Sequence, residues 1–238
     1  MLILALDTCD ARGGAALLRS ESVLQVESHT TTEDYSSWLL PAVGRVLTPA
    51  SLTLRDIELY AVAAGPGSFT GVRVGLTTVK AWSEVYGQPI AAVSRLEALA
   101  SESVGSCPYV AAFIDARRNQ IFAGLYHRQA TGLERIDEEM VIAPDKFLEW
   151  CAGKAGFDGI DWVSTDPNCV TQLPQWSTRR PPNETVQEAS ALLAPRIGQI
   201  GYHLARQNRL TDAMSLDANY VRRSDAELLW KGSSQHAV

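Results

Sequence analysis

A short pattern of strand, aspartate, polar turn and strand occurs twice in this chain, about a hundred residues apart. The first copy spans residues 2–17 and contains Asp7, and the second spans residues 110–125 and contains Asp115. In each copy an apolar run typical of a buried strand ends at the aspartate, and the chain returns after a polar turn. Chance similarity of two hairpins and duplication of a lobe explain the pattern about equally well. If the pattern marks a duplication, the chain folds as two related α/β lobes.

The length of the chain also favours two lobes. At 238 residues the chain is near the size at which a single hydrophobic core stops growing, and lobes of about 100 residues are usual. Apolar residues make up 46% of the chain, which is enough for a sizeable core. We predict a first lobe over residues 1–103 and a second over residues 104–223, with a long helix at 185–206. A polar tail is expected over residues 224–238.

Charge and cysteine spacing exclude several classes of protein. The net charge is −6, so the chain has no general attraction for a polyanion and is not expected to hold RNA by itself. The four cysteines, Cys9, Cys107, Cys151 and Cys169, form no CxxC pair, which argues against a zinc ribbon or a redox motif. The start has no signal-peptide pattern, and no apolar run reaches the ~20 residues of a membrane helix. We therefore expect a cytoplasmic protein with no membrane contact.

A glycine-rich segment at residues 65–71 follows a predicted strand at 59–64 and opens a predicted helix. Backbone N–H groups and the helix dipole favour an anion at such a place. The spacing matches neither the dinucleotide fingerprint nor a P-loop, since no Gly-Lys-Ser/Thr follows. One interpretation is a degenerate phosphate site; the other is a tight turn in which Ser68 or Thr70 caps the helix. The candidate residues are Gly65, Gly67, Ser68, Thr70 and Gly71.

The helix expected at residues 70–86 is apolar on two opposite sides. One stripe contains Val72, Leu76 and Val79, and the other contains Val74 and Ala81. An ordinary surface helix has one such stripe, so the second side must pack on another helix of this chain or on another protein. The helix expected at residues 34–47 has a broad apolar arc as well: Tyr35, Trp38, Leu39, Ala42 and Val46. Both interpretations stay open on periodicity alone.

Residues that could carry catalysis are sparse. No two of the histidines, His29, His127, His203 and His236, have the i, i+4 spacing of a helical metal site, and no GxSxG elbow is present. Asp7 and Asp115 could face a cleft as paired carboxylates, although strand-end turn residues are the commoner case. We predict no catalytic residue and no metal site.

The segment Ala64-Gly65-Pro66-Gly67-Ser68-Phe69-Thr70-Gly71-Val72-Arg73-Val74-Gly75 closely resembles the signature of the TsaB family, also called YeaZ. Supporting matches occur at residues 4–8, 93–99, 114–118 and 220–223. The resemblance implies a two-lobed actin-like, Hsp70-like (ASKHA) fold, and a degenerate paralogue of the catalytic subunit TsaD. TsaD holds its metal with helix histidines, and here Tyr35-Ser36 occupies the matching place, so that metal site is missing. No cofactor is expected.

The resemblance further implies a non-catalytic subunit of the complex that forms threonylcarbamoyladenosine (t6A) at position 37 of ANN-decoding tRNAs. The expected partners are a TsaD-type catalytic subunit, a TsaE-type ATPase and a second copy of this chain, with tRNA reached only through the complex. The docking core is expected to combine Val72, Leu76 and Val79 with the arc of the preceding helix, and Val74 with Ala81 is the alternative. The competing functions are an active actin-like phosphotransferase and a peptidase.

Overall fold

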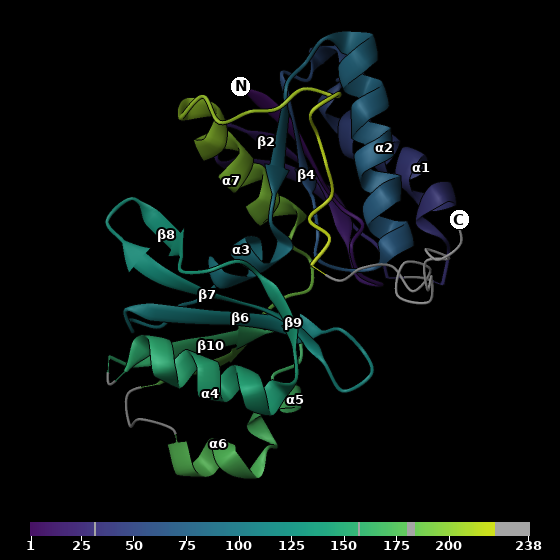
Figure 1. Cartoon of the computed structure of the whole chain (residues 1–238). Coiled ribbons are helices and arrows are strands. Elements are labelled where there is room, and N and C mark those ends of the chain that lie inside the picture. Colours follow the sequence, from purple (N-terminus) through teal and green to yellow (C-terminus); the bar gives the residue numbers. More distant parts are fainter. Residues whose placement is uncertain (31, 157, 180–183, 222–238) are drawn as a thin grey trace, which may run out of the picture.

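The computed structural model describes residues 1–30, 32–156, 158–179 and 184–221. Two β-sheets lie one above the other, and helices lie between them and on their outer faces (Figure 1). This is the two-lobed α/β architecture that the repeated pattern predicts. The predicted polar tail, over residues 224–238, lies outside the described residues.

The first sheet has the strand order β3-β2-β1-β4-β5. An antiparallel meander supplies three strands, and β4 and β5 add to β1 in parallel. The strands are β1 (Leu2–Asp7), β2 (Gly14–Arg19), β3 (Ser22–Ser28), β4 (Leu59–Ala63) and β5 (Ile90–Val93). β1, β2 and β4 lie where the apolar runs at residues 2–17 and 59–64 predict strands. β1 and β4 are buried almost throughout, as expected of strands covered on both faces.

The second sheet has the order β11-β10-β6-β7-β8, which reproduces the first when it is read in the opposite direction. Here β6 and β7 form the antiparallel hairpin, β8 continues it, and β10 and β11 add in parallel. The strands are β6 (Tyr109–Asp115), β7 (Ile121–Gln129), β8 (Gly132–Arg135), β9 (Met140–Ile142), β10 (Ile160–Ser164) and β11 (Val186–Glu188). The matching order favours duplication over chance similarity of two hairpins.

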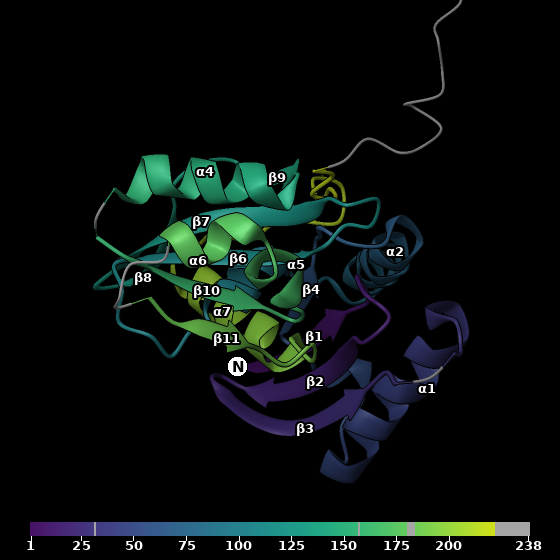
Figure 2. The same cartoon turned by 90° about the horizontal axis from the view of Figure 1, so that it is seen from below.

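The outer helices follow the same plan in both lobes. In the first lobe α1 (Tyr35–Leu47) packs on β2 and β3, and α2 (Phe69–Tyr86) packs on β4. In the second lobe α4 (Pro144–Ala155) packs on β7 (Figure 2). Short helices complete this layer and its connections: η1 (Thr48–Ala50), η2 (Leu54–Asp56), α5 (Asn168–Thr171) and α6 (Pro174–Arg179).

Each of the two helices between the sheets packs on the sheet of the lobe to which it was not assigned by the predicted boundaries. α3 (Arg95–Ala100) lies within the predicted first lobe but packs on β6 and β7, while α7 (Ala194–Arg206) packs on β1, β2, β4 and β5. The assignment of the C-terminal helix to the second lobe is therefore wrong. The predicted helix at 185–206 is also too long, because residues 186–188 form β11 and the helix begins only at Ala194.

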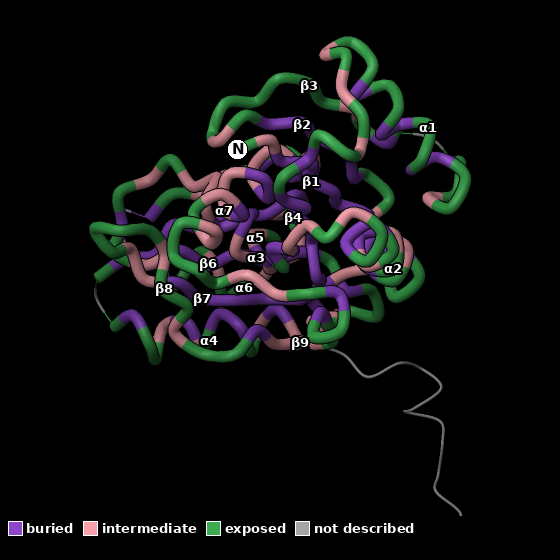
Figure 3. The backbone as a smooth tube through the Cα atoms, turned by 90° about the horizontal axis from the view of Figure 1, so that it is seen from above, coloured by how far each residue is buried: buried purple, intermediate pink, exposed green. Residues whose placement is uncertain are grey.

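Figure 3 shows where this arrangement leaves exposed surface. The tube is buried along the central strands, whereas α1 and α2 have exposed residues on their outer sides. No helix in the described part of the chain has the length and apolar character needed to cross a membrane. The four cysteines are free thiols.

Candidate functional site

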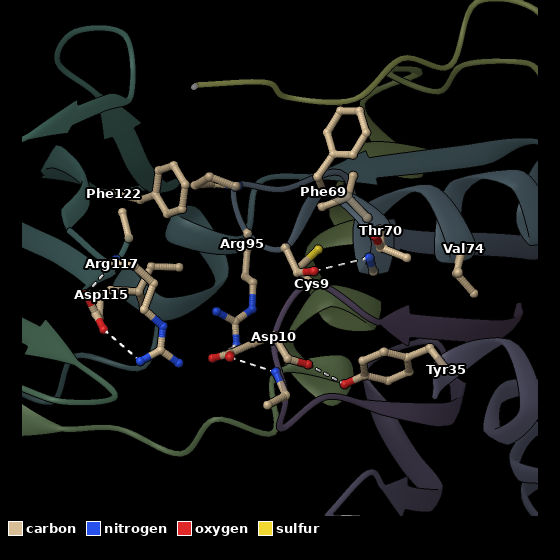
Figure 4. Close-up of a pocket in the computed structure, with 18 of the residues that line it drawn as sticks. Cys9, Asp10, Tyr35, Phe69, Thr70, Val74, Arg95, Asp115, Arg117 and Phe122 are labelled. Carbon is tan, nitrogen blue, oxygen red and sulfur yellow. Dashed lines mark hydrogen bonds and ion pairs between the residues drawn. The ribbon is translucent and has the colours of Figure 1, made fainter. Parts of the chain in front are cut away.

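A cleft with a volume of about 1060 Å³ opens where the lobes meet. Its walls are the β1–β2 loop, the start of α1, the glycine-rich loop that leads into α2, and the β6–β7 turn, with residues 219–221 alongside. Figure 4 shows Arg95 in the middle of this cleft, Asp10 beside it, and Asp115 with Arg117 across from it. Candidate residues far apart in sequence therefore meet here.

The glycine-rich loop packs directly on the β1–β2 loop. A Cβ atom on Gly67 would lie 2.2 Å from the Cys9 carbonyl oxygen, and one on Gly71 would lie 2.0 Å from that of Thr8. The Ser68 amide donates to the Cys9 carbonyl at 2.7 Å, so this N–H is already used. Glycine is required at these two positions because only a residue without a Cβ permits the close approach.

Ser68 also caps α2, since its hydroxyl accepts from the Gly71 amide at 3.4 Å. The capping-turn interpretation of this loop is thus the one that the contacts support. Gly67, Ser68, Thr70 and Gly71 all line the cleft, and Thr70 is exposed there. Gly65, the remaining candidate, accepts at its carbonyl from the Arg95 amide at 2.7 Å. A phosphate at this loop stays a prediction.

Asp7 is completely buried and held by two donors. Arg95 Nε donates to its Oδ2 at 3.0 Å, and the Cys9 amide donates to its Oδ1 at 2.9 Å. Arg95 is 1% exposed, and its Nη2 donates to Asp10 Oδ2 at 3.3 Å. Burial alone would lower the pKa of Arg95, but Asp7 and Asp10 raise it and the net shift is upward. This internal cation neutralises Asp7.

The cleft therefore does not present the expected pair of carboxylates. Asp7 is absent from its walls, and Asp10 lies there instead. Asp115 does line the cleft, where its side chain is 43% exposed and pairs with Arg117 Nη1 at 3.3 Å.

The cleft also offers no reactive thiol at Cys9. Burial, with the charge of Asp7, raises the pKa of the Cys9 thiol well above its ordinary value, so this thiol stays protonated. Across the described ranges, no three or more His, Cys, Asp or Glu side chains cluster in a way that could hold a metal ion.

The expected docking residues are mostly internal, which corrects the assignment of the stripes. Tyr35 is half-buried, and its hydroxyl donates to the Asp10 carbonyl at 2.5 Å. The other seven are buried within this chain: Trp38, Leu39, Ala42, Val46, Val72, Leu76 and Val79. The reason is the close approach of α2 to the β1–β2 loop and to β4, since a Cβ on Gly75 would lie 2.5 Å from Thr8 Oγ1 and 3.5 Å from Val62 Cγ2. That approach turns the neighbouring Val72, Leu76 and Val79 inward.

The outward side of α2 is the alternative stripe. Ala81 is exposed, Val85 is 72% exposed and Val74 is half-buried. On α1, which lies beside α2, Leu40 is 60% exposed and Pro41 is exposed next to it. We call Leu40, Val74, Ala81 and Val85 the outer apolar face. Leu40, Ala81 and Val85 are exposed in this chain by itself, whereas Val74 packs partly against the core and lines the cleft.

Sequence reasoning missed two residues that organise the site. In the sequence, Arg95 is noted only as part of the segment 93–99 that matches the family. An arginine close to the apolar residues Val93 and Leu96, at the start of a helix, nevertheless indicates a buried charge that needs a partner. Glu139 is buried as well and accepts from Tyr126 Oη at 2.7 Å, Asn219 Nδ2 at 2.6 Å and Ser94 Oγ. It joins both lobes to the C-terminal segment, and no local pattern indicates it.

Comparison with known proteins supports the resemblance. The family model described as "TsaD: tRNA N6-adenosine threonylcarbamoyltransferase" matches residues 25–165, more than half of the chain. The "tRNA threonylcarbamoyladenosine biosynthesis protein TsaB" of Bacillus subtilis is 29% identical over 97% of this chain and 98% of its own length. The Escherichia coli protein of the same name is 30% identical over 69% of this chain and 70% of its own length. The chain belongs to the TsaD family and, within it, to the TsaB proteins.

Solved structures agree with this TsaB assignment. "YeaZ from Pseudomonas aeruginosa" has a TM-score of 0.75 and 25% identity, over 92% of this chain and 99% of that one. A ROK hexokinase from Thermus thermophilus has a TM-score of 0.50 at 10% identity, over 86% of this chain and 100% of that one, and this likeness shows the fold alone. The predicted actin-like, two-lobed ASKHA fold of a TsaB protein is confirmed.

Proposed function

We propose that this chain is a non-catalytic subunit of the machinery that forms threonylcarbamoyladenosine on tRNA. In this role it supports a TsaD-type catalytic subunit together with a TsaE-type ATPase. Its relatives in B. subtilis and E. coli carry the name of that biosynthesis. The fold is that of the TsaD family, so a pairing of two related two-lobed subunits is the natural form of such a complex.

The observation that carries the non-catalytic role is the buried pair of Asp7 and Arg95. A carboxylate that accepts from a guanidinium and a backbone amide, with no exposed surface, is poorly placed to bind a metal ion or to take a proton from a substrate. Asp115, the other candidate, is exposed and paired with Arg117. The actin-like phosphotransferase alternative has no comparable support, because only the fold of the hexokinase is shared.

The outer apolar face is the part of the molecule that suits docking. Ala81 and Val85 lie exposed on α2, and Leu40 lies exposed on the neighbouring α1. Two such helices against the two equivalent helices of a partner would form a four-helix bundle, as the family resemblance implies. The partner is the TsaD-type subunit, or a second copy of this chain when that subunit is absent.

Reconstitution tests this function. A TsaD-type protein and a TsaE-type protein from the same organism, with tRNA, ATP and the threonylcarbamoyl adenylate, should form t6A only when this chain is added. Mass spectrometry of digested tRNA measures the product. The chain alone should give no transfer and negligible ATP turnover. Robust turnover by the pure chain that Asp7→Asn abolishes would contradict the non-catalytic role, and full modification without the chain would contradict its place in the machinery.

A further inference from the structure

The guanidinium group of Arg95, which Figure 4 shows next to Asp10, lies between two carboxylates. Its Nε donates to Asp7 Oδ2 at 3.0 Å and its Nη2 donates to Asp10 Oδ2 at 3.3 Å, so one edge of the planar group faces both acceptors. The third nitrogen, Nη1, is buried and has no hydrogen-bond partner among the described residues. The side-chain contacts that hold the guanidinium group are therefore those to the two carboxylates.

Without this arginine, the same two carboxylates would suit a divalent cation. Mg²⁺ and Mn²⁺ favour oxygen ligands, and Mg²⁺ is usually held by one or two carboxylates while it keeps several waters. The two acceptor oxygens face the same edge of one group, so a single ion in its place would lie between them. The side chain of Asp10 is 37% exposed and lines the cleft, which leaves room for water ligands.

With Arg95 in place, the site does not fit a metal ion. Arg95 lines the cleft and Asp7 lies fully buried behind it, so the guanidinium separates this carboxylate from anything that enters the cleft. A divalent cation at Asp10 would also lie beside a permanent positive charge, which repels it. The two negative charges already have a partner that carries one positive charge.

Unlike a metal ion, this cation cannot dissociate. Arg95 is the first residue of α3, its backbone amide donates to the Gly65 carbonyl at 2.7 Å, and Ser94 caps the helix. We propose that Arg95 is a resident cation that takes the place of a divalent metal ion at the end of β1, and that removal of its guanidinium exposes a metal site formed by Asp7 and Asp10.

This inference deepens the proposed function, because it gives a physical cause for the non-catalytic role, and it rests on that proposal for its meaning in t6A formation. A phosphate group at the glycine-rich loop of the wild type would find no carboxylate-held metal ion beside it. The positive charge next to this loop is instead a fixed part of the chain. Phosphate binding that depends on Mg²⁺ is therefore not expected of the wild type.

Mn²⁺ binding by the full chain tests the inference. The thermal unfolding midpoint of Arg95→Ala should rise by about 3–5 °C for each tenfold increase in Mn²⁺ above the dissociation constant. Electron paramagnetic resonance, which measures the free ion, should show a single bound Mn²⁺ per chain. The wild type should show neither effect, and wild-type binding that Asp7→Asn abolishes would overturn the inference.

Two further variants assign the ligands. Adding Asp7→Asn to Arg95→Ala should abolish the Mn²⁺ effect, because it removes a ligand and its charge. Arg45→Ala is the matched control, since Arg45 belongs to a surface ion pair with Glu27, and it should gain no Mn²⁺ binding. A folded Arg95→Ala chain that binds no Mn²⁺ would overturn the inference, as would binding that the added Asp7→Asn leaves unchanged.

If Arg95→Ala is unfolded in metal-free buffer, circular dichroism replaces the unfolding midpoint as the measurement. Excess Mn²⁺ should then restore the folded spectrum of Arg95→Ala and leave that of the variant with the added Asp7→Asn unchanged. No restoration in Arg95→Ala would overturn the inference. These measurements use the chain alone, so they are separate from the reconstitution of t6A formation. A reconstituted system that needs no such chain would count against the proposed function and leave the metal result standing.

Discussion

Arg95 is the largest side chain that the described part of the molecule buries completely, and its charge is balanced by Asp7 and Asp10. Taking ions out of water costs several kcal/mol each, and a well-formed pair with further hydrogen bonds offsets much of that cost. Asp7 has such a further bond from the Cys9 amide. At the residue scale, this pair links the end of β1 to the start of α3 and keeps a strand-end carboxylate out of the cleft.

Arg95→Met should lower the free energy of unfolding by about 3–5 kcal/mol, because it leaves Asp7 as an uncompensated buried charge. Chemical denaturation measures the loss. Adding Asp7→Asn to Arg95→Met should restore part of the stability. Arg45→Met is the control, since Arg45 pairs with Glu27 on the surface, and its effect should stay within about 1 kcal/mol. Equal effects of the two arginine changes would contradict the buried pair.

Glu97, unlike Arg95, is a residue whose charge is unfavourable in the fold. Burial raises its pKa, and the nearby charge of Glu139 raises it further. A carboxyl whose pKa is higher when folded destabilises the protein above that pKa, and the penalty fades as pH falls and the group is protonated. Glu97→Gln should therefore raise the unfolding midpoint at pH ~7, and the gain should vanish near pH ~4. Glu188→Gln, at an exposed position, should show no such pattern.

At the element scale, α2 shows what a sequence can and cannot predict. Periodicity identifies two apolar sides on this helix, but the pattern is symmetric and does not say which side meets the sheet. The signal that could have decided is the glycine pair Gly71 and Gly75, one turn apart, which marks the side of closest approach.

The start of α7 could also have been predicted more accurately. Proline is favoured in the first turn of a helix, so Pro195 indicates the observed start at Ala194 better than the predicted start at Thr185. Which sheet α3 or α7 packs on depends on contacts across the whole chain, so no local pattern predicts their exchange.

Gly75→Ala should destabilise the protein by ~1–3 kcal/mol, because the added methyl would lie 2.5 Å from Thr8 Oγ1 and push α2 away from the sheet. Gly153→Ala is the matched control within α4, where an added Cβ meets nothing within 4 Å. That change should stabilise the protein by ~0.5–1 kcal/mol, as expected for alanine in a helix. Thermal unfolding measures both. A stabilising Gly75→Ala would show that α2 does not depend on this close approach.

At the scale of the whole molecule, Glu139 ties the parts together. Ser94 precedes α3, Tyr126 belongs to β7 and Asn219 belongs to the C-terminal segment, and all three donate to this one buried carboxylate. The Asn219 amide also donates to the Ala64 carbonyl at 2.8 Å, next to the glycine-rich loop. These hydrogen bonds link the start of α3, strand β7 and the C-terminal segment to one another beside the cleft.

Glu139→Ala should leave buried donors without an acceptor and lower the free energy of unfolding by at least ~1–3 kcal/mol. Hydrogen exchange should show loss of protection around residues 209–221, whose backbone lies against β5 and the glycine-rich loop. Glu138→Ala is the control at an exposed neighbouring position and should change neither quantity. Unchanged exchange in Glu139→Ala would show that the C-terminal segment is held without this carboxylate.

The proposed docking role is tested most directly by a charge on the outer apolar face. Burying an unpaired carboxylate in a helix–helix contact costs several kcal/mol, and a loss of ~4 kcal/mol weakens a complex about a thousandfold. Leu76→Glu, at a buried position, should unfold the chain and serves as the internal control. Ala81→Glu, at an exposed position, should keep the circular dichroism of the wild type and abolish pull-down by the TsaD-type protein. A folded Ala81→Glu variant that binds that protein as tightly as the wild type would contradict docking through this face.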